Sequence, residues 1–276
     1  MTPANVRSQL YEPYTVSAEQ IRFFRENGFI KLKSVLSAET VAWMDKVITA
    51  EVERLNQQTL PMEKRDTYGK AFLQVMNIWT RSEVVKEIVF SRRLAKIAAD
   101  LMEVSGVRIY HDQALYKEPR GGHTPWHADQ YYWPLASDKS ITVWIPLQET
   151  PLSWGPLEFS AGSHRLSSGR NLKISDESQD FLEGQLKEKG FRQVVEPFSM
   201  GEVSYHAGWL FHRAAPNHSG QMRKVMTVIY MDINMKLKAP DNDNQVADWN
   251  TWCPGVKVGD VIDSALNPVL YTGESS

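Results

Sequence analysis

The pattern of apolar and polar residues divides the chain into a helical first third and a β-rich remainder. Ser17 and Gln20 have the spacing of a helix-capping box, and Gly28 is placed to end that helix. A second helix is predicted after Ser37, where apolar residues recur at helical spacing. A third is predicted at about 91–102, with its apolar residues on one face.

From about residue 106 the pattern changes to short alternating runs separated by Gly, Pro, Asn and Ser. The alternation is clearest at 141–145, where every second residue is aliphatic, as expected of a strand. Further strands are predicted at 29–32, 107–110, 113–117, 157–159, 193–197, 203–206 and 224–233. Short strands without intervening helices favour a sandwich or barrel over a parallel α/β sheet.

Two segments have less regular patterns. Residues 176–190 are polar and charged, and we expect a helical or mobile insertion of the kind that often serves as a lid. Residues 240–256 are rich in Pro, Asp and Asn and carry Trp249 and Trp252, which favours an ordered loop over the barrel or a tail. The chain is therefore interpreted as one domain over 1–276, with a helical part at about 17–105, a β core at about 106–235 and a tail at about 236–276.

Composition narrows the function classes. The 276 residues are 42% hydrophobic and 23% charged, and the net charge of −2 offers no basic surface for nucleic acid. No apolar run reaches the roughly 18 residues that a membrane span needs, and the first residues lack a secretory core. The one cysteine, Cys253, cannot form an internal disulfide, so a cytoplasmic protein is expected. The nine tryptophans fit either a packed core or a pocket for a small-molecule partner. Oligomeric state is left open.

The strongest local signal for chemistry is a histidine followed two residues later by an aspartate. In a strand, His127 and Asp129 would point to the same face and could reach one ion. The best third ligand is His212, because two His and one carboxylate form the facial triad of non-haem Fe(II) oxygenases. His206 is the main alternative. The other histidines are interpreted as structural or surface residues: His111, His123, His164 and His218.

An arginine follows the candidate ligands at a useful place. Arg223 lies eleven residues after His212 and immediately before the strand predicted at 224–233. Its guanidinium can bind a carboxylate through two parallel hydrogen bonds, and a buried arginine without an anion would cost several kcal/mol. Together with an iron site that keeps open positions, this residue predicts 2-oxoglutarate and O2 as cosubstrates beside Fe(II).

These residues belong to longer motifs that resemble the phytanoyl-CoA dioxygenase family of Fe(II)/2-oxoglutarate oxygenases. The similarity extends over most of the chain, through Ile21–Ile30, Lys117–Pro119, His127–Asp129, Trp144–Leu147 and Gly155–His164, to His212 and Arg223. It implies a mainly β fold with flanking α-helices and a double-stranded β-helix (jelly-roll, cupin-like) core. In this comparison His127, Asp129 and His212 match the iron ligands, and Arg223 matches the residue that binds the distal carboxylate of 2-oxoglutarate.

The resemblance implies a dioxygenase that hydroxylates, or otherwise oxidises, a C–H bond of a small metabolite and releases succinate and CO2. Two positions depart from the family: Ala128 stands where many relatives have Gln, and Ala214 where some have Ser. The second departure removes one hydrogen bond expected to 2-oxoglutarate. Asp129 is retained, whereas related halogenases replace it with a small residue, so oxygenation is expected.

Weaker candidates surround these residues, and ordinary packing or a solvated loop is the alternative for each. Candidates for contacts with the cosubstrate are Gln113, Thr142 and Trp144. Candidates for contacts with the substrate are Arg120, His123, Tyr131, Tyr132 and Trp133.

Two other function classes stay open. A zinc enzyme would also accept two His and a carboxylate, but zinc gives no reason for Arg223. A non-catalytic metal or small-molecule binding protein on a cupin-like barrel would have no need of the complete ligand set. Turnover of 2-oxoglutarate separates both from an oxygenase.

Overall fold

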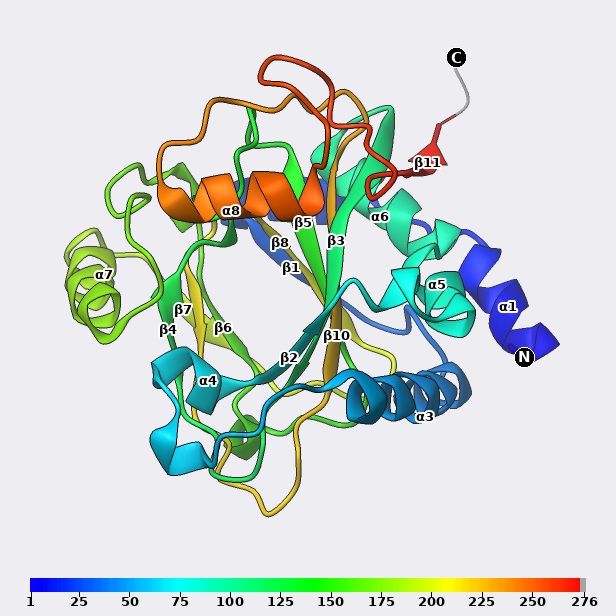
Figure 1. Ribbon diagram of the computed structural model, residues 1–276, viewed down its shortest axis with the longest axis horizontal. Helices are drawn as coiled ribbons and strands as arrows, with labels where there is room; N and C mark the ends of the chain where they lie inside the picture. The colour runs from blue at the N-terminus through cyan, green and yellow to red at the C-terminus, as the bar shows by residue number, and fades with distance from the viewer. Residues whose placement is uncertain (274–276) are drawn as a thin grey trace.

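The computed structural model describes residues 1–273, the side chain of Tyr68 excepted, and shows two β-sheets with helices around them (Figure 1). The helices are α1 Ala4–Tyr11, α2 Ala18–Asn27, α3 Ala38–Leu55, α4 Thr67–Ala71, α5 Glu83–Val89, α6 Arg92–Met102, α7 Asp176–Glu188 and α8 Asp243–Trp252. The strands are β1 Phe29–Leu32, β2 Leu73–Met76, β3 Gly106–Tyr116, β4 Thr124–His127, β5 Ser140–Pro146, β6 Leu157–Ser160, β7 Gln193–Val195, β8 Val203–Ala207, β9 His212–Ala214, β10 Val225–Asp232 and β11 Val269–Thr272.

The strands form a major and a minor antiparallel sheet. The major sheet has the order β1-β8-β5-β10-β3-β11, with β2 also paired to β3, and the minor sheet has the order β4-β9-β6-β7. The two sheets enclose one cavity, because residues of both line it. This arrangement confirms the predicted jelly-roll core with flanking helices. Within the described residues, no helix has the length and apolar character needed to cross a membrane.

Strand β5 shows how the alternating pattern separates core from cavity. Ile141, Val143 and Ile145 are completely buried in the main apolar core, which the helices on the outer face complete. Thr142 and Trp144 point the other way and line the cavity between the sheets. Side chains in a strand alternate between faces, so the aliphatic face stabilises the fold and the mixed face is left for chemistry.

The helical layer covers the outer face of the major sheet. On α6, the buried side chains of Leu94, Ile97 and Leu101 pack into the core, and each such burial contributes about 1.5–3 kcal/mol. The Tyr205 hydroxyl on β8 donates a hydrogen bond of 3.0 Å to the Leu94 carbonyl oxygen, which ties this helix to the sheet. This layer gives the strands that line the cavity a fixed support.

The predicted helix signals hold at α2 and α3. Ser17 and Gln20 form the capping box, and Gly28 ends α2 in the left-handed region at φ 77°. The Ser37 side chain accepts a hydrogen bond from the Thr40 backbone N–H at the start of α3. The helix predicted at 91–102 is confirmed as α6.

Other expectations need correction. Residues 240–256 were expected as a loop or tail, but most of them form α8, which Asn242 caps through the Gln245 backbone N–H. Separate strands at 107–110 and 113–117 are one strand, β3, because His111 and Asp112 also pair with β10. Of the two alternatives for 176–190, the helical one holds as α7.

A glycine in the turn before β8 allows a prediction about stability. Gly201 has φ 83°, and a Cβ there would overlap the Leu36 carbonyl oxygen. Gly201→Ala is expected to lower the free energy of unfolding by about 2–5 kcal/mol, from left-handed strain and the clash together. Urea denaturation measures it. Gly190→Ala is the matched control, because Gly190 has φ 71° and open space around it; it should cost only about 1–2 kcal/mol. Equal losses would contradict the clash.

Candidate metal centre and its cavity

Three potential metal ligands meet at the inner face of the minor sheet. One donor atom each from His127, Asp129 and His212 lies within 4.8 Å of the other two. His127 Nε2 is 3.4 Å from Asp129 Oδ1, and His212 Nε2 is 3.7 Å from the same oxygen. The three side chains therefore present two imidazole nitrogens and one carboxylate oxygen to a single point.

Strand pairing brings the ligands together across 85 residues of chain. His127, the last residue of β4, is the direct partner of His212, the first residue of β9. Asp129 lies in the 3₁₀ turn that follows β4, a small correction to the expectation that it belongs to a strand. The backbone at Ala128 stays extended, with φ −120° and ψ 130°, so residues 127 and 129 still share one face.

Backbone hydrogen bonds set the orientation of both imidazoles. His127 Nδ1 lies 2.7 Å from the Pro125 carbonyl oxygen, and His212 Nδ1 lies 3.0 Å from the Leu210 carbonyl oxygen. A carbonyl oxygen only accepts, so each Nδ1 carries the proton and each Nε2 keeps a lone pair for a metal. Burial lowers the pKa of His212 well below its usual range, which keeps that imidazole neutral.

The carboxylate of Asp129 is held from the major sheet. Thr142 Oγ1 donates to its Oδ2 at 3.2 Å, and His206 Nε2 lies 3.1 Å from the same oxygen. Burial would raise the pKa of Asp129, but the nearby imidazoles, His212 first, outweigh burial and hold it well below its usual range. Oδ1 is thus left to face His127 and His212, while His206 contacts the other oxygen, Oδ2.

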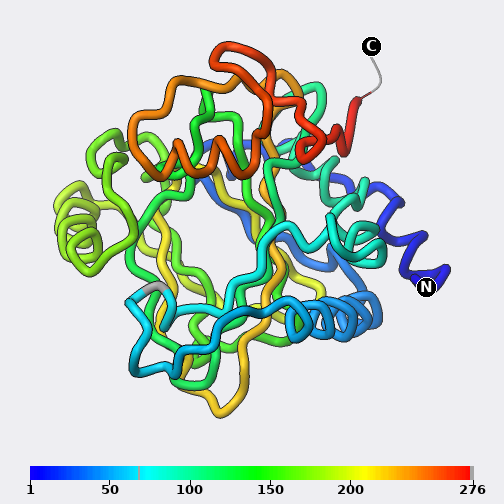
Figure 2. The backbone as a smooth tube through the Cα atoms, in the orientation of Figure 1, coloured from blue at the N-terminus to red at the C-terminus, as the bar shows by residue number. Residues whose placement is uncertain are grey.

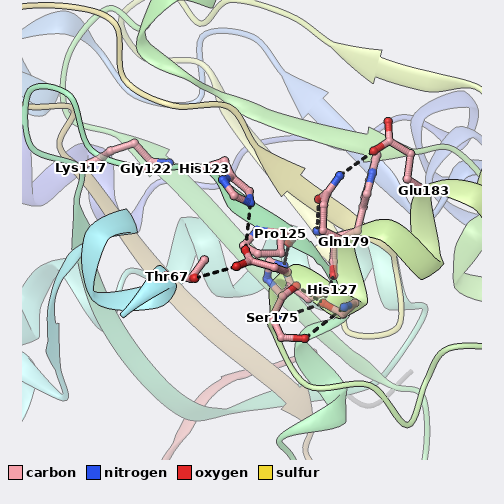
Figure 3. Close-up of polar contacts among 12 residues, drawn as sticks. Thr67, Lys117, Gly122, His123, Pro125, His127, Ser175, Gln179 and Glu183 are labelled. Atoms are coloured by element: carbon pink, nitrogen blue, oxygen red, sulfur yellow. Dashed lines mark hydrogen bonds and ion pairs between the residues drawn. The ribbon is translucent and has the colours of Figure 1, made fainter. Parts of the chain in front are cut away.

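Helix α7 fixes the strand that carries His127 (Figure 3). The Trp126 backbone N–H donates to Gln179 Oε1 at 2.9 Å, and Ser178 Oγ donates to the Trp126 carbonyl oxygen at 3.2 Å. His123 faces the first turn of the same helix, with its Nε2 3.7 Å from Asp176 Oδ1. The metal ligand therefore sits on a strand that is bonded to β9 on one edge and to α7 on the other.

The side chains of His127, Asp129 and His212 face a cavity of about 320 Å³ between the sheets. Arg223 lines this cavity and is completely buried. Its Nη1 donates to the Gly155 carbonyl oxygen, while Nε and Nη2 have no hydrogen-bond partner among the described residues. The guanidinium carbon lies 5.5 Å from the centroid of the Trp144 ring and 5.6 Å from that of Phe72. Two donor nitrogens are thus presented to the cavity between aromatic rings.

Burial lowers the pKa of Arg223 to about 9, so it still carries its charge at neutral pH. Arg223 forms an isolated β-bridge with Lys117, and their backbones exchange hydrogen bonds of 2.8 and 2.9 Å. Burial, and then the charge of Arg223, lowers the pKa of Lys117 well below its usual range. The Lys117 amino group donates to the carbonyl oxygens of Gly122 and Ala215. Arg223, which lines the cavity, therefore makes this end basic.

The other sequence candidates are distributed unevenly. Gln113, Thr142, Trp144, Tyr132 and Trp133 line the cavity. Arg120, His123 and Tyr131 are not among the described residues that line it. Arg120 is exposed, and the Tyr131 hydroxyl accepts a hydrogen bond from Asn244 on α8. These three residues were candidates because they neighbour the metal motif in sequence, and nearness in sequence did not place them at the cavity.

Several cavity residues carried no usable signal in the sequence. Gln74 on β2 donates to Gln113 Oε1 at 2.6 Å, and Thr227 on β10 donates to the Gln113 carbonyl oxygen at 3.1 Å. Asp248 reaches the cavity from α8. The strand that carries Gln74 was not predicted, and residues 240–256, which include Asp248, were not predicted as a helix. The sequence therefore could not place Gln74 or Asp248 at the cavity.

Comparison with known proteins now decides the family. The model of the family described as phytanoyl-CoA dioxygenase (PhyH) matches residues 24–225. The chain belongs to the phytanoyl-CoA dioxygenase family. This family member is 25% identical over 232 residues to a probable alpha-ketoglutarate-dependent hypophosphite dioxygenase of Stutzerimonas stutzeri, covering 77% of this chain and 78% of that protein. It is also 25% identical over 267 residues to an ectoine dioxygenase of Bordetella parapertussis, covering 93% and 79%.

Several solved structures share the fold of this chain. The alpha-ketoglutarate-dependent carbocyclase SnoK from nogalamycin biosynthesis superposes with a TM-score of 0.76 at 22% identity, covering 94% of this chain and 100% of that one. EctD from S. alaskensis with 2-oxoglutarate and 5-hydroxyectoine gives a TM-score of 0.66 at 22% identity, covering 84% and 83%. The protein is a 2-oxoglutarate-dependent dioxygenase that uses Fe(II), 2-oxoglutarate and O2.

The side chains fit this cofactor set. Two imidazoles and a carboxylate on one side of a metal are the ligands of non-haem Fe(II) oxygenases, and they leave the cavity side open. The unpaired donors of Arg223 fit a carboxylate bound in the same cavity.

Metal titration tests the ligand assignment. Replacing a ligand, as in His212→Ala, is expected to lower Fe(II) affinity by more than about 100-fold, whereas replacing an outer partner, as in His206→Ala, should lower it by about 10–100-fold. Anaerobic titration of the apoprotein with Fe(II), followed by metal analysis, gives both values. If His206→Ala were the more damaging of the two, the third ligand would be His206.

Proposed function

We propose that this enzyme hydroxylates a C–H bond of a small-molecule metabolite. One oxygen atom of O2 enters the substrate as a hydroxyl group and the other enters succinate, while 2-oxoglutarate loses CO2. Two of the relatives that match the chain are described as a hypophosphite dioxygenase and an ectoine dioxygenase, and both of these substrates are small molecules. We also infer that 1–276 is a single oxygenase domain. Three strands that lie outside the range 106–235 in the sequence, β1, β2 and β11, all pair into the major sheet.

The observation that carries the proposal is the state of Arg223. A buried guanidinium with two donor nitrogens unpaired is costly unless a bound anion completes its hydrogen bonds. The distal carboxylate of 2-oxoglutarate has the planar geometry and the charge to accept both bonds. A zinc hydrolase or a simple metal-binding protein has no use for such a group beside the metal ligands.

Each element of the site then has a defined task. When bound, Fe(II) and 2-oxoglutarate supply the oxidising chemistry, which the side chains themselves do not perform. The triad His127, Asp129 and His212 holds the metal on one side, and Arg223 fixes the far end of the cosubstrate. The rings of Trp144 and Phe72 pack around the guanidinium, which keeps water from competing for the carboxylate.

Optical spectroscopy tests cosubstrate binding directly. Anaerobic protein with Fe(II) is expected to develop a metal-to-ligand charge-transfer band in the visible range when 2-oxoglutarate is added. Asp129→Ala is expected to lose the band, because the metal loses its carboxylate ligand. Protein that binds Fe(II) but shows no band with 2-oxoglutarate would overturn the proposal in favour of a binding protein.

The role of Arg223 predicts a loss of cosubstrate affinity. In Arg223→Ala, the Kd of 2-oxoglutarate is expected to rise by at least about 30-fold, since loss of one partner of a buried charged pair costs roughly 2–5 kcal/mol. Titration of the same visible band measures this value, and metal content should stay unchanged. Arg54→Ala is the control, because Arg54 is exposed at the end of α3 and pairs with Glu51. An unchanged Kd in Arg223→Ala would remove Arg223 from this role.

A further inference from the structure

Helix α8 places a carboxylate in the same cavity that holds the metal ligands. The helix is the orange segment labelled α8 in Figure 1 and traced in the same colour in Figure 2. Its inner side is fixed by Gln245 Nε2, which donates to the Tyr131 carbonyl oxygen at 2.9 Å, and by Trp249 Nε1, which donates to the Val256 carbonyl oxygen at 2.8 Å. Asp248 follows Gln245 at helical spacing and lines the cavity.

The carboxylate lies away from the basic end. Strand register puts Thr142, Ile229 and His111 in one row across β5, β10 and β3, and Trp144, Thr227 and Gln113 in the next. Arg223 lies beyond this second row and reaches back to the Trp144 ring. On the other side, Asp248 Oδ2 accepts a hydrogen bond of 3.1 Å from the hydroxyl of Tyr110, the residue before His111.

The metal ligands lie between these two ends. Thr142, in the first row, donates to Asp129, which places the metal centre level with that row. One end of the cavity therefore carries the cation Arg223 and the other end carries the carboxylate of Asp248. A dicarboxylate such as 2-oxoglutarate is attracted to the first end and repelled from the second.

The structure supplies no counter-charge for Asp248. The Tyr110 hydroxyl is its hydrogen-bond donor, and within the described part of the chain no Lys, Arg or His nitrogen lies within 4.0 Å of its oxygens. The titratable groups around it are Tyr110, Tyr132 and Cys253, and burial raises the pKa of each, to about 12 for the latter two. Nearby His111 is neutral because burial lowers its pKa to about 4.

Aromatic rings surround this unpaired carboxylate. Trp133 and Tyr132 line the same cavity as Asp248, and the ring of Tyr110, whose hydroxyl bonds Asp248, lies 5.5 Å from that of Trp133. Aromatic faces attract cations, and a partly buried carboxylate attracts them more strongly than it would in water. The same carboxylate and ring faces repel an anionic group.

We propose that the substrate is a cation, an amine or an amidine, whose charged nitrogen binds to Asp248 while its reacting C–H bond lies beside the metal. This inference rests on the proposed function. It assigns Arg223 to the cosubstrate and Asp248 to the substrate, so that charge alone sorts the two reactants to opposite ends of the cavity.

Three probes of similar size test the charge preference. Benzylamine, benzyl alcohol and benzoate are titrated at pH 8 into anaerobic protein that carries Fe(II) and 2-oxoglutarate, and tryptophan fluorescence gives each Kd. Benzylamine, as its ammonium ion, is expected to bind at least tenfold more tightly than the other two. Broadening of its proton resonances by the paramagnetic Fe(II) then places it near the metal. Equal affinities, or tighter binding of benzoate, would overturn the proposal.

Substitution of the carboxylate localises the preference. Asp248→Asn keeps an acceptor oxygen for the Tyr110 hydroxyl and removes only the charge, so benzylamine should lose its tenfold advantage. Asp243→Asn is the matched control, an exposed aspartate on the same helix, and should keep the advantage. Tyr110→Phe should keep it as well, because the charge remains. An undiminished preference in Asp248→Asn would exclude Asp248 as the cation site.

Thermal denaturation separates a binding role from a structural one. Burial raises the pKa of Asp248 from 3.8 to about 7, so its effect on stability is most favourable below pH 4 and is lost as the pH rises through 7. Asp248→Asn is therefore expected to raise the Tm of the apoprotein at pH 8, with no gain near pH 4. A lower Tm at pH 8 would mean a structural carboxylate. The 2-oxoglutarate band should persist in this variant, so loss of the band and loss of charge preference report on different proposals.

Discussion

The pairing of His127 with His212 across β4 and β9 is the contact on which the site depends. Adjacent antiparallel strands hold their side chains at a fixed separation, so two imidazoles from distant parts of the chain meet without any loop having to order them. The backbone carbonyls of Pro125 and Leu210 then set the protonation of both rings. Only Asp129 needs support from the opposite sheet, which Thr142 and His206 provide.

The two faces of the major sheet have different effects: one stabilises the fold and the other is available for ligand binding. The outer face is aliphatic and closes a core with the helices, which stabilises the fold. The inner face lines the cavity with polar groups that a packed core would exclude, and Arg223, just before β10, and Asp248, on α8, reach the same cavity. Polar groups that are buried without partners destabilise the empty protein, and ligands that complete their hydrogen bonds recover that free energy on binding. The unpaired polar groups of the cavity therefore lower the folding stability of the empty protein and raise its affinity for ligands.

The sequence predicted the elements whose signals are local. Capping residues and periodic apolar positions located α2, α3, α6 and β5. The order of residue types singled out His127, Asp129, His212 and Arg223, which the structure brings to one cavity. Segments whose form depends on distant partners were missed. Strand β2 exists because it pairs with β3, and α8 because its polar residues Gln245 and Asp248 find partners on other elements. Arg120 and His123 show the converse, since residues adjacent to a motif in sequence need not face its cavity.

The position of α8 in the chain has a consequence for how this enzyme can change. The residues that hold the metal and Arg223 all lie within 24–225, the part that matches the family model, whereas α8 spans Asp243–Trp252 beyond it. The wall of the cavity that α8 forms is thus encoded separately from the oxidising centre. Exchange of the segment after β10 for one of different charge would change the charge at this end of the cavity while leaving His127, Asp129, His212 and Arg223 in place, which makes this segment a natural unit for grafting and for directed evolution.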